Sequence, residues 1–231
     1  MPEFLPYLQT ILSTLKMLFE GLTYTVLIFM LTLCFSIPLG LVVAKLRMSK
    51  NVVISSIIRV YISIMRGTPL MLQLLVWYYG PYYIFGIRLS DLSIGPVDYR
   101  FIATIIGFSF NYAAYFGEIF RSGIQSMPQG QYEAGTVLGF TKYQTFFKII
   151  LPQVFKRVLP AVTNEVITLV KDTSLAQVIA VSEMFVIAKS LASAQVSVMP
   201  FIVAGIIYYV LNGVIEILMN RLEKRMSYYS L

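Results

Sequence analysis

The chain has 231 residues, of which 58% are hydrophobic, and a formal net charge of +7. This apolar fraction exceeds what the core of a soluble domain of this size needs, so the composition predicts an integral membrane protein. The sequence has no histidine and one cysteine, Cys34, which excludes disulfide frameworks, zinc sites and Ser-His or Cys-His catalysis. The basic residues lie between apolar segments rather than along one polar face, so topology explains them better than a nucleic-acid partner does.

Long intervals free of Asp, Glu, Lys and Arg mark candidate membrane spans, because crossing a bilayer core takes about 20 apolar residues as helix. Four intervals contain no formal charge: 21–44, 67–87, 101–117 and 190–215. A fifth segment, 159–179, is mostly apolar but includes Glu165, Lys171 and Asp172. We expect no cleavable secretory leader before them, because the first 15 residues contain no basic residue.

The basic residues decide whether the fifth segment crosses, because Lys and Arg concentrate in cytoplasmic loops. Basic clusters lie within 45–59, 121–157 and 221–225, whereas the segment 88–100 balances two Arg against two Asp. Five crossings place all three clusters on one side, and four would separate the tail from the other two. We therefore predict an all-α membrane protein with five transmembrane helices, the N-terminus outside and the C-terminus inside.

The expected organisation is a single transmembrane domain over residues 1–231, without a second soluble domain. The approximate spans are 18–45, 52–86, 100–122, 157–180 and 195–220, and a cytoplasmic loop covers 123–153. Within the second span, Pro69 lacks a backbone donor and disfavours helix at the preceding residue. We therefore expect a break or kink near Thr68.

The cytoplasmic loop carries the most informative pattern. It reads Gln131-Tyr-Glu-Ala-Gly-Thr-Val-Leu-Gly139 and, nine residues later, Ile149-Ile-Leu-Pro-Gln153. This pattern predicts a short helix that Ser126 and Gln129 would cap and that Gly139 would close. From the residues alone, such a helix either presents a handle to a cytoplasmic partner or lies on lipid headgroups.

Seven residues of this loop resemble, at matching spacing, the EAA loop of permease subunits of bacterial ATP-binding-cassette importers: Glu133, Ala134, Gly135, Gly139, Ile149, Leu151 and Pro152. Gly135 stands where that family usually has alanine, which costs up to about 1 kcal/mol of helix propensity. Further stretches in the same order are similar to the polar amino-acid branch, of histidine, glutamine, arginine or cystine type: Arg66-Gly-Thr-Pro-Leu70, Ala113-Ala-Tyr115, Arg121-Ser-Gly-Ile-Gln125 and Lys171-Asp-Thr-Ser-Leu175. The resemblance covers nearly all of 21–216.

The resemblance implies a type I importer permease with five core helices in the bacterial cytoplasmic membrane. It implies that separate ATPase subunits dock at Glu133, Ala134, Gly135, Gly139, Leu151 and Pro152. The expected partners are these ATPases, a second permease that is identical or a sister chain, an extracytoplasmic amino-acid-binding protein, and lipid. No cofactor is expected in this chain, because ATP and magnesium would bind to the partner. Thr136 and Val137 indeed stand where a phosphate-binding loop would need Lys and Ser or Thr.

The charges of the fifth segment are candidates for substrate binding, because a charge within a span costs at least about 2.5 kcal/mol and usually faces protein or water. Glu165 and Asp172 are two helical turns apart and share a face with Thr168. Two carboxylates on one face suit an ammonium or guanidinium group. The alternative is that Lys171 or a neighbouring helix neutralises one of them and the group only holds helices together.

Other candidates come from the family resemblance and from the predicted break. Arg66 and Thr68 at the break offer donors for a substrate α-carboxylate. The alternative there is an ordinary proline kink, with Arg66 extending to the inner headgroups. Asn111 and Tyr115 in the third span, and Ser174 beside Asp172, complete the candidate substrate contacts. In related permeases, residues matching Glu165 and Asp172 lie at a mid-membrane amino-acid site.

We therefore predict a transport subunit without its own ATPase site, which forms the pathway for a polar or cationic L-amino acid. The alternative is an ion-coupled secondary transporter or channel, which would need no docking loop. A membrane-embedded hydrolase fits worst, because Glu165 and Asp172 are two turns apart rather than side by side. The residues leave open which amino acid is carried and whether the permease pair is a homodimer or a heterodimer.

Overall fold

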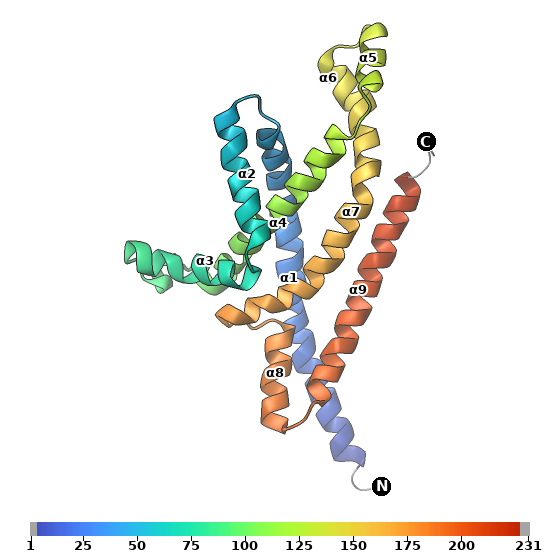
Figure 1. Ribbon diagram of the computed structural model, residues 1–231. Coiled ribbons are helices and arrows are strands. Elements are labelled where there is room, and N and C mark those ends of the chain that lie inside the picture. Colours follow the sequence, from blue (N-terminus) through green and yellow to red (C-terminus); the bar gives the residue numbers. More distant parts are fainter. Residues whose placement is uncertain (1–3, 227–231) are drawn as a thin grey trace. The chain divides into compact units, whose positions relative to one another are not determined.

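The computed structural model describes residues 4–226 (Figure 1). The regular elements in this range are helices: α1 (Phe4–Arg47), α2 (Val52–Gly67), α3 (Leu70–Phe85), η1 (Leu89–Leu92), α4 (Tyr99–Gln125), α5 (Gln129–Val137), α6 (Lys142–Thr145), the π-helix η2 (Phe146–Ile150), α7 (Leu151–Asp172), η3 (Thr173–Ile179), α8 (Met184–Gln195) and α9 (Met199–Met226). The only β-type pairing within the described range is an isolated bridge between Ile94 and Val97. The predicted all-α class is confirmed.

Two of the described helices are long and apolar enough to cross a membrane by themselves, namely α9 and the part of α1 from residue 11 to residue 47. Two bent pairs meet the same criteria jointly, α2 with α3 and the segment 142–179 with α8, so the described chain has two to four candidate spans. The expected range 100–122 lies within α4, which carries several polar residues. The number of five crossings and the sides of the two termini stay predictions.

The predicted break at Thr68 is present. α2 ends at Gly67 and α3 begins at Leu70, with Pro69 in an extended conformation between them. The side chain of Gln73 turns back and donates to the Thr68 carbonyl oxygen at 3.1 Å and to the Thr68 hydroxyl at 2.9 Å. This amide therefore replaces part of the helical hydrogen bonding that the proline interrupts.

The described helices belong to two compact units. Unit 1 comprises 1–34, 68–109 and 167–214. Its apolar core joins α1, α8 and α9 through Leu18, Met184, Ala188, Val203 and Ala204. A glycine allows the closest of these approaches, because a Cβ atom at Gly21 would lie 2.7 Å from the Met184 Cα atom. η3 packs against α3 within the same unit.

Unit 2 comprises 35–67, 110–166 and 215–231. A small core forms where Val43 of α1, Ile62 of α2 and Ala114 of α4 meet. The hydroxyl of Tyr61 donates to the Phe110 carbonyl oxygen at 2.5 Å, which ties α2 to α4. The loop predicted over 123–153 folds as α5, α6 and η2, which lie at one end of α7 (Figure 1).

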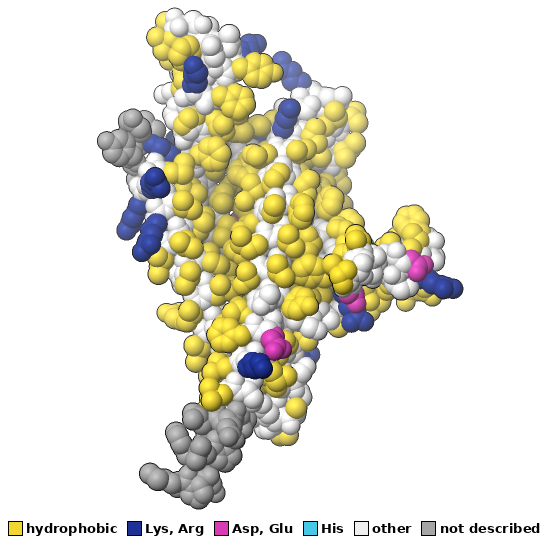
Figure 2. Space-filling view, turned by 180° about the vertical axis from the view of Figure 1, so that it is seen from behind, with side chains coloured by type: hydrophobic (Ala, Val, Ile, Leu, Met, Phe, Trp, Pro, Cys, Tyr) yellow, Lys and Arg dark blue, Asp and Glu magenta, His cyan; other side chains and the backbone are white. Residues whose placement is uncertain are grey.

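Large hydrophobic side chains cover much of the described surface, as the face drawn in Figure 2 shows. On α9 the exposed hydrophobic residues include Ile202, Ile206, Tyr209, Val210, Val214, Ile217 and Leu218. A soluble monomer rarely exposes apolar area on this scale, so these faces are suited to lipid or to protein partners.

Candidate functional site

A cavity of about 370 Å³ lies within unit 2, between the end of α2, the second half of α4 and α7. Its lining residues are Arg66, Tyr115, Glu118, Ile119, Ser122, Gly123, Ser126, Arg157, Val158, Ala161 and Glu165. The structure therefore brings together three of the predicted substrate contacts, Arg66, Tyr115 and Glu165. The volume is in the range of small-molecule pockets, which are usually between about 300 and 1,000 Å³.

Arg66 and Tyr115 contact each other in this cavity. The guanidinium carbon of Arg66 lies 5.2 Å from the centre of the Tyr115 ring, which is a cation–π geometry. Such a contact is worth about 0.5–1 kcal/mol where water has access. It leaves the edge of the planar guanidinium group with its N–H donors available, and this edge is the part that binds carboxylates.

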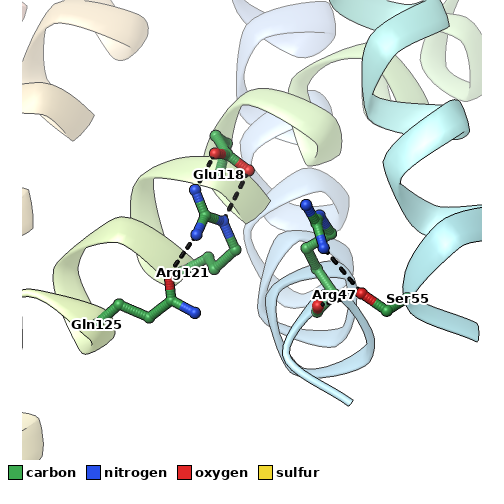
Figure 3. A network of polar contacts seen from close by, with 5 residues as sticks. All are labelled: Arg47, Ser55, Glu118, Arg121 and Gln125. Carbon is green, nitrogen blue, oxygen red and sulfur yellow. Dashed lines mark hydrogen bonds and ion pairs between the residues drawn. The ribbon is translucent and has the colours of Figure 1, made fainter. Parts of the chain in front are cut away.

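Glu118 lines the same cavity but has a cationic partner of its own. Arg121, one turn further along α4, forms an ion pair with Glu118 and also donates to the Gln125 side chain (Figure 3). Figure 3 also shows Arg47 donating to the Ser55 hydroxyl at 2.8 Å, in the turn between α1 and α2. The ion pair neutralises the charge of Glu118.

Arg157 is a cavity residue that the sequence interpretation assigned only to topology. Its guanidinium group donates to the Ser126 carbonyl oxygen at 2.6 Å and to the Ser126 hydroxyl at 3.1 Å. These bonds connect α7 to the end of the α4 segment. The sequence signal for this role was weak, because Arg157 belongs to a basic cluster that the positive-inside rule already explains.

The other predicted substrate residues have different surroundings. Asn111 is buried, and its amide donates to the Met65 carbonyl oxygen at 2.9 Å, which satisfies an acceptor in the last turn of α2. Thr68 accepts hydrogen bonds from Gln73. Neither residue lines the cavity in unit 2. Their proposed contact with substrate is untested and stays a prediction.

The carboxylate segment is helical up to Asp172, where α7 ends and η3 begins. The last turn of α7 carries Lys171, which is exposed, and Asp172, which is half-buried. Thr168 is exposed, and the Ser174 hydroxyl donates to the Lys171 carbonyl oxygen at 2.8 Å. Glu165 lies in unit 2, whereas Thr168, Lys171, Asp172 and Ser174 lie in unit 1. A substrate role for these four residues also stays a prediction.

The predicted docking helix is present as α5, and it ends as the sequence suggested. Gly139 has a left-handed conformation with a φ of 76°. The Phe140 amide donates to the Gly135 carbonyl oxygen, and the Gly139 amide donates to the Thr136 carbonyl oxygen. This pair of bonds is the Schellman arrangement that ends helices at a glycine.

The predicted capping pair of Ser126 and Gln129 is wrong. The residue before α5 is Pro128, no described side chain caps this helix, and the Ser126 hydroxyl instead donates to the Gly123 carbonyl oxygen. A reciprocal capping box forms instead after α5, where Thr141 and Gln144 exchange hydrogen bonds at the start of α6. The sequence Thr-x-x-Gln at 141–144 carried this signal.

The glycine at position 135 has a structural reason. Gly135 is buried, and a Cβ atom there would lie 2.6 Å from both the methyl group and the hydroxyl oxygen of Thr145. α5 and α6 therefore pack with almost no space between them. The neighbouring residues Glu133 and Ala134, which are predicted docking residues, are exposed, as are the large apolar residues Val137, Leu138 and Tyr143.

Pro152, a predicted docking residue, lines a second cavity of unit 2, of about 630 Å³, beside three cations: Lys148, Lys156 and Arg157. The Gln153 amide donates to the Gln131 side chain at 3.1 Å and to the Ile149 carbonyl oxygen at 2.8 Å. The bond to Gln131 attaches α5 to the first turn of α7, which is the helix that carries Glu165.

Comparison with known proteins shows which family the chain resembles. The chain resembles the L-cystine transport system permease protein TcyB of Bacillus subtilis (strain 168), with 35% identity over 212 residues, which is 90% of this chain and 86% of TcyB. It also resembles the arginine transport system permease protein ArtQ of the same organism, with 32% identity over 209 residues, which is 90% of this chain and 91% of ArtQ.

A solved structure described as an amino acid ABC transporter with histidines matches with a TM-score of 0.82 and 30% identity, over 94% of this chain and 97% of that one. Residues 36–228 match the family described as "Binding-protein-dependent transport system inner membrane component". The resemblance inferred from the EAA loop is thereby confirmed. The chain belongs to this family of inner-membrane permease components of ABC importers.

Proposed function

We propose that this permease forms the translocation pathway for a polar or cationic L-amino acid in an ATP-driven importer of the bacterial cytoplasmic membrane. The observation that carries the proposal is the cavity of unit 2, where Arg66 and Glu165 line one space of about 370 Å³. An amino acid carries a carboxylate and an ammonium group, and this cavity offers a group of opposite charge to each. Similar permeases are named for cystine, for glutamate and aspartate, and for arginine.

The α-carboxylate is held by Arg66 in this proposal. Tyr115 stacks on one face of the Arg66 guanidinium group, so the side chain loses less freedom when a substrate binds to its edge. Glu165 holds the α-ammonium group or a cationic side chain. Thr68, Asn111, Thr168, Lys171, Asp172 and Ser174 are proposed as further contacts on the basis of the sequence resemblance.

The proposed topology has five crossings within one transmembrane domain. They are α1, the pair of α2 and α3, α4, the pair of α7 and α8, and α9, with the N-terminus outside and the C-terminus inside. The two long helices and the two bent pairs support four of these crossings. The positive-inside rule supports the fifth, because only an odd number places the three basic clusters together.

ATP is hydrolysed by separate subunits that dock on α5 in this proposal. The docking contacts are Glu133, Ala134, Gly135, Gly139, Leu151 and Pro152. The exposed apolar side chains of Val137 and Leu138 beside them support the assignment, because exposed apolar patches mark protein interfaces. The other partners are a second permease subunit and an extracytoplasmic amino-acid-binding protein, and this chain itself holds no ATP or magnesium.

The test is uptake into proteoliposomes that contain the permease, its ATPase subunits and its binding protein. We expect uptake of radiolabelled L-arginine, L-glutamine, L-glutamate or L-cystine only when ATP is present on the side of the membrane that carries the ATPase subunits. Uptake that an imposed proton or sodium gradient drives equally well without ATP would support the ion-coupled alternative instead. A complex with Val137 and Leu138 both changed to Asp should lose ATP-driven uptake, because charges would enter the docking surface.

A further inference from the structure

Unit 1 contains one completely buried carboxylate that the proposed pathway does not use. Glu183 has an exposed fraction of 0% and lies between η3 and α8, where the segment 142–179 is bent by 60° against α8. A carboxylate without solvent is costly unless donors surround it. The described structure gives Glu183 no ion pair, so its partners must be neutral groups.

Four donors surround the Glu183 carboxylate. The backbone amides of Phe185 and Val186 donate to it at 2.9 Å each, which caps the N-terminus of α8. The Tyr208 hydroxyl of α9 donates to it at 2.9 Å. The Thr25 hydroxyl of α1 lies 3.4 Å from the same carboxylate and accepts the Met184 amide at 3.2 Å. Glu183 therefore joins three helices, namely α1, α8 and α9.

The same tyrosine reaches the other end of η3. The Tyr208 side chain also interacts with the side chain of Thr173, the first residue of η3, and Thr173 is itself completely buried. Thr173 lies between Asp172 and Ser174, both of which are proposed substrate contacts. Glu183 and Tyr208 thus connect the segment between η3 and α8 to Thr173, the residue at which η3 begins.

η3 needs such support, because it is an unusual segment. It has seven residues of 3-10 helix, whereas runs longer than three or four residues are uncommon and often mark hinges. It ends at Ala180, which has a left-handed conformation with a φ of 57°. A residue other than glycine adopts this conformation only where its surroundings hold it there.

We propose that Glu183 and Tyr208 are positioning residues, which hold η3 at both ends and thereby set the orientation of Asp172 and Ser174 toward the substrate. This inference rests on the proposed function, because it assumes that the segment 172–174 contacts an amino acid. Glu183 itself does not touch the substrate. Removing one member of the cluster weakens substrate binding without changing the chemistry of the binding groups.

The test uses the permease with its ATPase subunits, without the binding protein, so that only the membrane site is measured. Equilibrium dialysis with radiolabelled L-arginine, L-glutamine, L-glutamate and L-cystine gives the dissociation constant of the wild type. Tyr208→Phe removes one hydroxyl group. Its matched control is Tyr209→Phe, the same change at the next residue, which is 80% exposed.

We expect Tyr208→Phe to raise the dissociation constant roughly five- to tenfold, since one hydrogen bond to the buried carboxyl group of Glu183 is lost. Tyr209→Phe should stay within about twofold of the wild type, and both variants should keep the basal rate of ATP hydrolysis. Glu183→Asp preserves the charge and the cap but shortens the reach to Tyr208, so it should behave like Tyr208→Phe. Glu183→Gln keeps the reach but turns an N–H2 donor toward at least one of the two backbone amides that cap α8, so it should also raise the dissociation constant.

Two results contradict the inference in different ways. If the wild type binds an amino acid and Tyr208→Phe binds it equally well, the cluster is only structural and the positioning role is wrong, while the proposed function stands. If the wild-type complex binds none of the four amino acids, the proposed substrate site is wrong and the inference fails with it.

Discussion

The hairpin of α5 and α6 in unit 2 and the bend between η3 and α8 in unit 1 solve the same problem in different ways. Each ends one helix and starts another within a few residues. The hairpin uses local devices, namely the left-handed Gly139 and the capping box of Thr141 and Gln144. The bend uses contacts between residues far apart in the sequence, because Glu183 bonds to Tyr208 and lies beside Thr25.

The difference indicates different tasks for the two regions. The hairpin is shaped by contacts between residues close in sequence and keeps Val137, Leu138 and Tyr143 exposed, which suits a surface that docks to a partner. The bend depends on three helices at once, so a movement of α1 or α9 would change it. This dependence suits a segment that takes part in a conformational change of the pathway.

The largest effect is expected from Gly21→Ala, which acts on the packing beside the bend. A Cβ atom at this position would lie 2.7 Å from the Met184 Cα atom, and backbone atoms cannot move aside. We expect a loss of about 2–3 kcal/mol in stability, seen as a lower melting temperature and a lower yield of the assembled complex.

The matched control is Gly205→Ala in α9, where no described atom lies within 4 Å of the added Cβ atom. This variant should be as stable as the wild type or slightly more stable, since alanine favours helix by up to about 1 kcal/mol. Equal melting temperatures for the Gly21 and Gly205 variants would show that α1 and α8 are not packed as described.

The next largest effect is expected from Gly135→Ala, which disturbs the packing of the α5–α6 hairpin rather than the bend. The added methyl group would overlap Thr145, and we expect a cost of about 1–2 kcal/mol and a several-fold drop in ATP hydrolysis stimulated by the binding protein. Adding Thr145→Ala should restore most of the stimulated rate. A double variant no better than Gly135→Ala alone would contradict the proposed contact.

A smaller effect is expected from Gly139→Ala, which tests the end of α5. The left-handed conformation costs a residue with a Cβ atom about 1–2 kcal/mol, so α5 should fray and stimulated hydrolysis should fall about two- to fivefold. Gly139→Asn should fall less, because asparagine tolerates this conformation. If alanine and asparagine behave alike, the backbone conformation does not limit docking.

The smallest effect is expected from Thr141→Ala, which removes the hydroxyl of the capping box. A lost N-cap costs typically about 1 kcal/mol, and α6 has only four residues, so hydrogen exchange of the amides around Gln144 should increase locally. Transport should change by less than about twofold. Ser126→Ala is the comparison, because Ser126 does not cap α5, and it should leave the exchange of α5 unchanged.

The contrast between local and long-range contacts also explains what the sequence could predict. The hairpin and the break at Pro69 depend on local residue types with known conformational preferences, so the loop helix, its closure at Gly139 and the interruption near Thr68 were predictable. The capping pair was predicted at the wrong helix, because Ser-x-x-Gln at 126–129 and Thr-x-x-Gln at 141–144 match the same sequence pattern. The close contact that requires Gly135 could not be predicted, because it depends on Thr145 across the turn.

Long-range polar contacts account for most of what the sequence did not reveal. Glu183 follows no motif that marks it as buried, and its role depends on Tyr208, which is 25 residues away, and on Thr25, which is 158 residues away. Arg157 likewise looked like one more cytoplasmic charge. By contrast, Glu165 was predicted from its charge within a span, Arg66 from the break at Pro69, and Tyr115 as a further candidate in the third span, and these three residues line one cavity.

The most direct measurement of the central claim is amino-acid binding by the permease and ATPase complex when the cavity charges are removed one at a time. Equilibrium dialysis would compare Arg66→Gln and Glu165→Gln with Arg59→Gln and Glu216→Gln, which make the same changes outside the residues that line the cavity. We expect at least about a tenfold loss of affinity for each cavity variant, as for a lost charge-assisted hydrogen bond, and less than about twofold for each control. Equal affinities in all four variants would contradict the claim that this cavity binds the transported amino acid.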